Sequence, residues 1–162
     1  MTALGALGTD GARMLVRGQF ELLAGGRSEP GMTLDILEAV GSDAALAPRV
    51  AEFRTSMAAM PLGEWTLALE GGDADRGRQV VNFNSAAACL RCHMVEGTGG
   101  HAAPSLAGVA DRHDRAGLLK SLVDPNAAVA EGFGTVSSMP AMGTVLTPRE
   151  VRDVVEYLST LR

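Results

Sequence analysis

The 162-residue chain contains little lysine and few aromatic side chains. Lys120 is the only lysine, and the other basic residues are arginines that form no dense run. The formal net charge is −5, so the chain lacks the basic patch of a nucleic-acid-binding protein, and nucleic acid is not an expected partner. Aromatic residues make up only 4% of the chain, whereas alanine and glycine are abundant, which favours small-residue helix packing over an aromatic-rich β-sandwich.

Long apolar runs are also missing. No stretch approaches the roughly 20 apolar residues that span a bilayer, so we expect no transmembrane segment in this chain. Residues 1–20 have no positive start followed by a sustained apolar run, so no secretory signal is visible. Hydrophobic residues still make up 46% of the chain, which is enough for a core in one ordinary domain or two small ones.

Cysteine occurs only twice, in the run Cys89-Leu90-Arg91-Cys92-His93. This is the haem attachment pattern C-x-x-C-H. Two thiols on a single turn can each form a thioether to one of the two vinyl groups of the macrocycle. The histidine that follows is then held beneath the iron, where histidine is a common axial ligand. The pattern therefore predicts covalent haem, with His93 bound to the metal.

Two other interpretations of the cysteine pair stay open on the motif alone. A redox disulfide needs a strand–turn–helix context, and here the loop-like stretch Ala86-Ala87-Ala88 precedes the motif. A zinc site needs two more ligands with clear spacing, and only His101 and His113 are available. The histidine that directly follows Cys92 makes haem the favoured interpretation.

A low-spin electron-transfer haem also needs a second axial ligand. Methionine raises the reduction potential, because a thioether is a soft neutral donor that favours ferrous iron. The candidates are Met139 and Met142, in a segment expected to be a loop just before the last helix. The alternatives are that both methionines fill the core, or that His101 is the ligand.

The composition divides the chain near residues 71–75, and both parts are predicted to be helical. Upstream, apolar spacing predicts helices over residues 8–24, 32–40, 47–60 and 61–70, with Thr33 as a cap and Pro61 near a helix entrance. Helix pairs of this size are typical of the end of a helical repeat array, although no clear self-similarity is present.

Downstream, three helices are expected, separated by loops over residues 85–112 and 126–146. The first covers residues 73–82 and has acidic residues in its first turn. The second covers residues 114–123 and is stopped by Asp124-Pro125-Asn126. The last begins at Thr147-Pro148-Arg149-Glu150, which reads as a cap, a proline at the first helical position and a glutamate at the third.

The order of these features resembles the class I cytochrome c family. The resemblance covers residues 73–162 and implies an all-α chain, in which a helical segment over residues 1–70 precedes a small class I cytochrome c domain. It also implies one covalent haem c with its iron. The matching features are Gly77 on the first helix, Cys89 to His93, Pro104-Ser105-Leu106-Ala107-Gly108, the middle helix, Met139-Pro140 and Glu156-Tyr157-Leu158.

The resemblance also implies roles for single residues. His93 would be the proximal ligand, and the carbonyl of Pro104 would accept a hydrogen bond from its other ring nitrogen. Met139 aligns with the distal methionine of the family, and Met142 falls where the family often has a large apolar residue. Further members of the haem wall are expected to be Leu106 and Val145.

Two features depart from the family pattern. The aromatic residue expected four positions after Gly77 is replaced by Val81, and Phe83 lies nearby, so we expect a rearranged helix contact with Tyr157. The lysine ring that surrounds the haem edge in the family is missing here. No strong steering field is therefore apparent from the sequence.

A narrower resemblance concerns residues 121–126 and 146–153. These stretches are similar to haem domains appended to large exported bacterial proteins, often behind helical repeats or a propeller dehydrogenase. In that setting residues 1–70 would be the tail of the upstream repeat region. Thioether attachment in this family takes place outside the cytoplasm, so the chain is expected to be periplasmic or otherwise extracytoplasmic. Met1 would then begin a mature or excised segment.

The expected function is an electron-transfer cytochrome that relays single electrons and is not itself an enzyme. Its partners would be redox proteins or an upstream dehydrogenase domain. The alternative is a haem enzyme or small-ligand sensor with a labile distal position, although no distal acid–base pair is evident. A third possibility concerns only residues 1–70, as an interaction module within a larger assembly.

Overall fold

A computed structural model describes residues 8–41 and 43–162 of the chain. The first seven residues of the expected 1–70 segment, and Ser42, lie outside the described residues. The chain forms two compact units, one that ends at Glu70 and one that begins at Gly71. The described residues are 55% helical and contain only two short strands, which confirms the expected all-α class.

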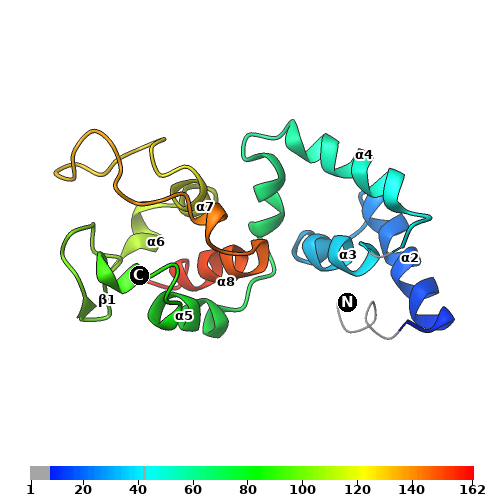
Figure 1. Ribbon diagram of the computed structural model, residues 1–162, viewed down its shortest axis with the longest axis horizontal. Helices are drawn as coiled ribbons and strands as arrows, with labels where there is room; N and C mark the ends of the chain where they lie inside the picture. Colours follow the sequence, from blue (N-terminus) through cyan, green and yellow to red (C-terminus); the bar gives the residue numbers. More distant parts are fainter. Residues whose placement is uncertain (1–7, 42) are drawn as a thin grey trace. The chain divides into compact units, whose positions relative to one another are not determined.

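The described residues of the N-terminal unit form three α-helices, α2 (Asp10–Ala24), α3 (Thr33–Val40) and α4 (Ala47–Ala58), which are labelled in Figure 1. Two 3-10 helices, η1 (Pro30–Met32) and η2 (Gly63–Ala68), complete it. Apolar residues of these elements form one core, because each helix turns one face inward. Its buried members are Val16, Phe20, Leu23, Leu34, Ile36, Leu37, Ala39, Val40, Leu46 and Leu67.

Two expectations for this unit were wrong. Thr33 is not a cap, because the 3-10 turn that begins at Pro30 runs directly into α3 and makes Thr33 its first residue. Residues 61–70 do not form an α-helix that enters at Pro61. Pro61 lies in a turn, and the segment continues as the 3-10 helix η2, in keeping with the common use of short 3-10 pieces as connectors.

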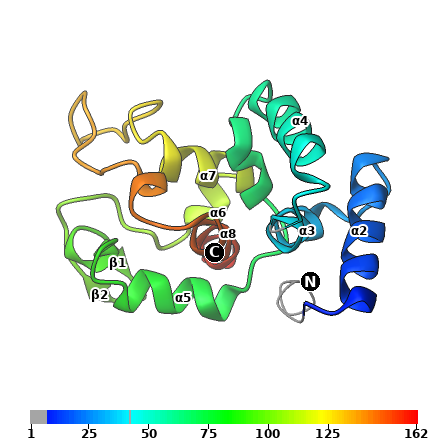
Figure 2. The same ribbon diagram turned by 45° about the vertical axis from the view of Figure 1, so that its right-hand side comes forward.

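The C-terminal unit is built on α5 (Ala74–Phe83), α6 (Val109–Arg112), α7 (Arg115–Val123) and α8 (Pro148–Leu158). Two 3-10 helices, η3 (Cys89–Arg91) and η4 (Met142–Thr144), lie in the connecting segments. A two-residue hairpin pairs β1 (Met94–Val95) with β2 (Thr98–Gly99) in antiparallel fashion, and Figure 2 shows it beside the C-terminal end of α5. This hairpin and α6 fall in a stretch that was expected to be mainly loop.

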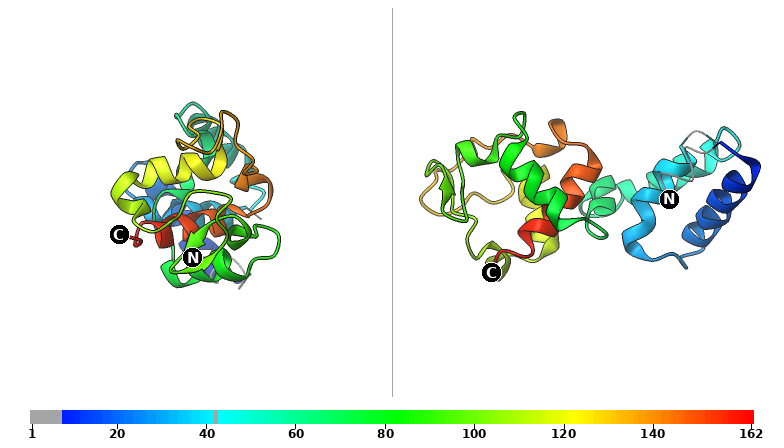
Figure 3. Two further views of the ribbon diagram at one scale, coloured as in Figure 1. Left: turned by 90° about the vertical axis from the view of Figure 1, so that its left-hand side faces the viewer. Right: turned by 90° about the horizontal axis from the view of Figure 1, so that it is seen from below.

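Helices α5 and α8 pack closely against each other, and both are visible in the right-hand view of Figure 3. A Cβ atom on Gly77 would lie 1.9 Å from the backbone oxygen of Asp153 and 2.8 Å from Cβ of Tyr157, so only glycine fits this crossing. Val81 takes the inward position at 2% exposure, whereas Phe83 is 82% exposed. Val81 therefore occupies the buried position where the resemblance led us to expect an aromatic side chain.

Each of the three longer helices of this unit begins at a side-chain cap. The carboxylate of Asp73 accepts the backbone N–H of Arg76 at 3.0 Å, and that of Asp114 accepts the backbone N–H of Gly117 at 2.8 Å. Thr147 begins α8 with the complete capping box that the sequence predicted. Within the described ranges, no helix is long and apolar enough to cross a membrane.

Candidate functional site

The two cysteines lie on a tight turn that leads out of α5. Cys89 begins η3 and is half-buried, Cys92 follows it and is exposed, and both thiols are unpaired. Burial, and to a smaller extent the neighbouring Cys92, raise the pKa of the Cys89 thiol. Redox-active C-x-x-C pairs have a lowered thiol pKa and lie at a helix N-terminus. Here the pKa shift is in the opposite direction and a β-hairpin follows, so the site does not resemble a redox disulfide.

The imidazole of His93 is held by one backbone carbonyl. Its Nδ1 lies 2.7 Å from the carbonyl oxygen of Pro104, and the ring is half-buried. A carbonyl can only accept, so Nδ1 carries the proton and the lone pair of Nε2 is available to bind a metal. This is the hydrogen bond that the sequence resemblance implied.

The loop that supplies this carbonyl is itself fixed by an arginine. The guanidinium of Arg112 donates from Nη2 to the carbonyl of Ser105 at 2.9 Å and from Nη1 to the carbonyl of Ala107 at 2.8 Å. Sequence reasoning did not identify this residue. Its position four residues after Gly108, on the short helix α6, is the only pattern that points to it, and α6 was not predicted.

Two glycines allow the chain to return across the cysteine turn. A Cβ atom on Gly99 would lie 2.1 Å from the backbone oxygen of His93, and one on Gly100 would lie 2.3 Å from that of Arg91. Gly99 also has a φ of +120°, which L side chains rarely adopt. The backbone of the hairpin therefore covers one side of the cysteine turn and holds its shape.

The two candidate methionine ligands differ in burial and in local structure. Met142 is only 4% exposed and lies in η4, which packs against α7. Met139 is half-buried in an irregular loop, where its backbone N–H donates to Oγ of Ser137 at 3.1 Å. Met142 is thus part of the protein core, and Met139 is the more accessible of the two methionines.

The segments that carry the predicted ligands lie at the same end of the C-terminal unit. One runs from α5 to α6 and contains the cysteine turn, and the other runs from α7 to α8 and contains Met139. Figures 1 and 2 and the right-hand view of Figure 3 show this arrangement. Leu106 and Val145, the expected wall residues, are half-buried and belong to these same segments.

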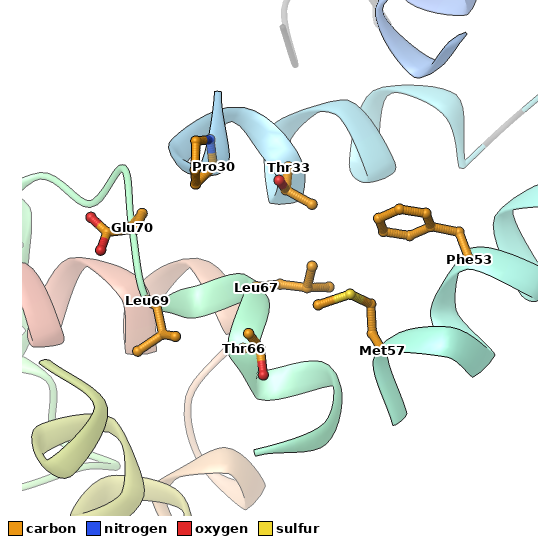
Figure 4. Close-up of a pocket in the computed structure, with 8 residues that line it drawn as sticks. All are labelled: Pro30, Thr33, Phe53, Met57, Thr66, Leu67, Leu69 and Glu70. Carbon is orange, nitrogen blue, oxygen red and sulfur yellow. The ribbon is translucent and has the colours of Figure 1, made fainter. Parts of the chain in front are cut away.

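The zinc interpretation finds no ligand set. His101 and His113 are both exposed, and no group of three or more His, Cys, Asp or Glu side chains in residues 8–41 and 43–162 is arranged to hold a metal ion. The N-terminal unit has an apolar pocket of about 220 Å³, shown in Figure 4. Its lining contains no histidine or cysteine, so the pocket provides no thiol or imidazole ligand. The lining residues are Pro30, Thr33, Phe53, Met57, Thr66, Leu67, Leu69 and Glu70.

The donor groups at the C-terminal unit fit a haem. Two unpaired thiols flank a turn, the Nε2 atom of a carbonyl-bound histidine is available for coordination, and a half-buried methionine lies on a loop at the same end of the unit. This combination defines the class of small helical proteins that bind haem through a C-x-x-C-H turn.

Comparison with known families agrees with this class. The sequence pattern of the family described as Cytochrome c matches residues 74–162, which is more than half of the chain. The chain belongs to the cytochrome c family, and its C-terminal unit is a haem-binding electron-transfer domain. A search of curated proteins found no match to this chain.

Proposed function

We propose that this protein relays single electrons through one haem c, with thioether bonds to Cys89 and Cys92 and with His93 and Met139 as axial ligands. The observation that carries the proposal is the 2.7 Å hydrogen bond from His93 Nδ1 to the Pro104 carbonyl. It selects the tautomer whose Nε2 can bind iron, and it orients the ring. When bound, haem supplies the iron that exchanges one electron between its ferric and ferrous states.

The surrounding residues adapt this site to electron transfer. The Pro104 carbonyl would fix the orientation of the His93 ring, and the thioether of Met139 would favour the reduced state. Leu106 and Val145 would line the haem site and exclude water from the macrocycle. If both axial ligands stay bound in both oxidation states, little structure has to change when an electron arrives or leaves. This arrangement suits a carrier, and the exposed His101 and His113 supply no buried acid–base pair for haem catalysis.

The proposed partners are redox proteins or an upstream dehydrogenase domain. Such encounters use small, transient interfaces, and the shortage of lysine argues against recognition through a lysine ring. The proposed location is periplasmic or otherwise extracytoplasmic, because thioether formation in this family is linked to export. The first 70 residues are proposed to be the tail of a helical repeat region, which is supported by the succession of short helices in this unit.

The first test is the intact mass of the matured protein under denaturing conditions. A mass that exceeds the polypeptide by one haem is expected. The bare polypeptide mass would contradict the proposal. Cys89 and Cys92 would then be interpreted as a redox disulfide or as metal ligands.

The second test compares Met139→Ala with Met142→Ala. Loss of an axial thioether should lower the reduction potential by on the order of a tenth of a volt or more, because axial ligands set potentials over a span of about 0.8 V. We expect this loss, and rapid binding of carbon monoxide to the reduced protein, only in Met139→Ala. Met142→Ala should instead reduce stability by about 2–5 kcal/mol, because it leaves a cavity in the core. The reverse pattern would make Met142 the ligand.

Rapid binding of carbon monoxide by the wild-type protein would favour the alternative function, a haem enzyme or small-ligand sensor with a labile distal position.

A further inference from the structure

The turn that leads into the cysteines is organised by the side chain of Asn84. Its Oδ1 accepts the backbone N–H groups of Ala86 and Ala87, each at 3.0 Å, and its backbone carbonyl accepts the N–H of Ala88 at 2.8 Å. Ala88 has a φ of +46°, a conformation that is uncommon for residues other than glycine and that needs support from its surroundings. Because Ala88 directly precedes Cys89, these hydrogen bonds set the direction in which the chain enters the haem attachment turn.

The same side chain also reaches α8. Nδ2 of Asn84 donates to Oε1 of Glu150 at 3.2 Å, across a sequence separation of 66 residues. The other carboxylate oxygen, Oε2, accepts the backbone N–H of Thr147 at 2.8 Å and its hydroxyl at 2.9 Å. Asn84 is therefore connected through one carboxylate to the residue that begins α8.

Thr147 marks the point where the segment that bears Met139 joins a fixed helix. Only seven residues lie between Met139 and Thr147, and they include η4, which packs against both α7 and α8. The segment from α5 to α6, which carries His93, is the proximal segment, and the segment from α7 to α8, which carries Met139, is the distal segment. The link between Asn84 and Glu150 thus joins the start of the proximal segment to the end of the distal one. Both segments are irregular over most of their length, so a cross-connection between them limits how far they can shift apart.

We propose that Asn84 is a positioning residue that holds the proximal and distal segments in register, and so keeps Met139 within reach of the iron. This inference rests on the proposed function. Asn84 would contact neither the iron nor its ligands. It would act only through the cysteine turn and the cap of α8.

Substitution of Asn84 by Asp separates the two roles of the side chain. Asn84→Asp keeps an oxygen for the N–H groups of Ala86 and Ala87, but it removes the donor to Glu150 and faces one carboxylate with another. Adding Glu150→Gln restores the link with its direction reversed, because the glutamine amide can donate to the new carboxylate. Glutamine also preserves the capping box with Thr147. Asn82→Asp, two residues earlier in α5, is the matched control for the added charge.

The experiment measures carbon monoxide binding to the reduced, matured proteins, together with amide hydrogen exchange at Ala87 and Thr147. The rate of carbon monoxide binding follows the fraction of molecules whose distal position is open. We expect Asn84→Asp to bind carbon monoxide about tenfold faster than the wild type, in line with the 10–100-fold effects of outer-shell substitutions at metal sites. Exchange at Thr147 should accelerate while Ala87 stays protected, and the double variant should return to within about twofold of the wild type.

Two results would overturn the inference. One is an Asn84→Asp protein that behaves like Asn82→Asp in carbon monoxide binding, which would leave Asn84 a merely structural residue. The other is a double variant that is no closer to the wild type than Asn84→Asp alone. The wild-type sample separately tests the proposed function: if it lacks covalent haem or binds carbon monoxide rapidly by itself, that function is wrong and the inference fails with it.

Discussion

Tyr157 connects α8 to the hairpin that follows His93. It is 4% exposed, and its hydroxyl donates to Oε2 of Glu96 at 3.2 Å, while Arg78 pairs with the same oxygen at 3.2 Å. Glu96 has a φ of +46°, so this carboxylate anchors a turn in an uncommon conformation. Burial, and next the nearby Glu96 carboxylate, raise the pKa of Tyr157 above its ordinary value.

The raised pKa of Tyr157 predicts a loss of stability at alkaline pH. Above the unfolded-state value of about 10, the unfolded chain releases a phenol proton that the folded chain retains. The stability that this group contributes is thus fully present below about pH 10 and is lost as pH rises through the folded pKa. Tyr157→Phe should cost about 1 kcal/mol near neutral pH through the lost hydrogen bond, and should show a shallower alkaline decline.

Urea unfolding at several pH values would measure this difference. Tyr157 is the only tyrosine in the chain, so no second phenol contributes to the comparison. Parallel stability curves for the wild type and Tyr157→Phe above pH ~10 would contradict the assignment.

Some residues of the site could be predicted from sequence, and others could not, for a physical reason. Cys89, Cys92 and His93 are proposed to bind the same haem and lie within five consecutive residues, so a short sequence motif is enough to identify them. Asn84 acts on a partner 66 residues away, and asparagine at a helix end has a sufficient local explanation as a cap. Only the fold brings Asn84 together with Glu150.

At the scale of elements, the close crossing of α5 and α8 depends on a glycine, Gly77, which has no side chain. Gly77 faces the backbone of Asp153, and a Cβ there would lie 1.9 Å from a carbonyl oxygen that cannot move without shifting the helix. We therefore expect Gly77→Ala to destabilise the C-terminal unit by about 1–3 kcal/mol, as overpacking does. Thermal unfolding followed by circular dichroism would measure the loss.

Gly18→Ala is the matched control for this substitution. Gly18 also lies inside a helix, α2, but open space surrounds the position of its Cβ. Alanine there should raise stability by about 0.5–1 kcal/mol, because glycine is a poor helix residue. If both substitutions stabilised the protein, the close packing at Gly77 would be wrong.

The longer helices were predicted well, and the shortest elements were not. Asp73, Asp114 and Thr147 each accept a backbone N–H of the first helical turn, and the three helices they begin lie within a residue or two of their expected bounds. The hairpin strands of two residues each and the four-residue α6 are too short to show a periodic pattern. The 3-10 helix η2 carries the apolar spacing of a helix, and spacing alone does not distinguish the two types.

At the scale of the whole molecule, each of the two units is stabilised by its own set of interactions. The apolar core of the N-terminal unit is built from residues up to Leu67. The caps of α5, α7 and α8, the His93–Pro104 hydrogen bond and the Asn84–Glu150 link all come from residues beyond Gly71. Among the described residues, the hydrogen bond that orients His93 joins two residues of the second unit.

We therefore expect haem binding to survive the loss of the N-terminal unit. A protein that lacks residues 1–70 should acquire covalent haem and keep the absorption spectrum and reduction potential of the full chain. Phe20→Ala in the full chain is a second, independent perturbation. Phe20 is 1% exposed in the N-terminal core, and its truncation should cost that unit about 3–5 kcal/mol without changing the spectrum. If either change abolished haem incorporation, residues 1–70 would be part of the haem fold, and the division of the chain at Glu70 would not be a division of function.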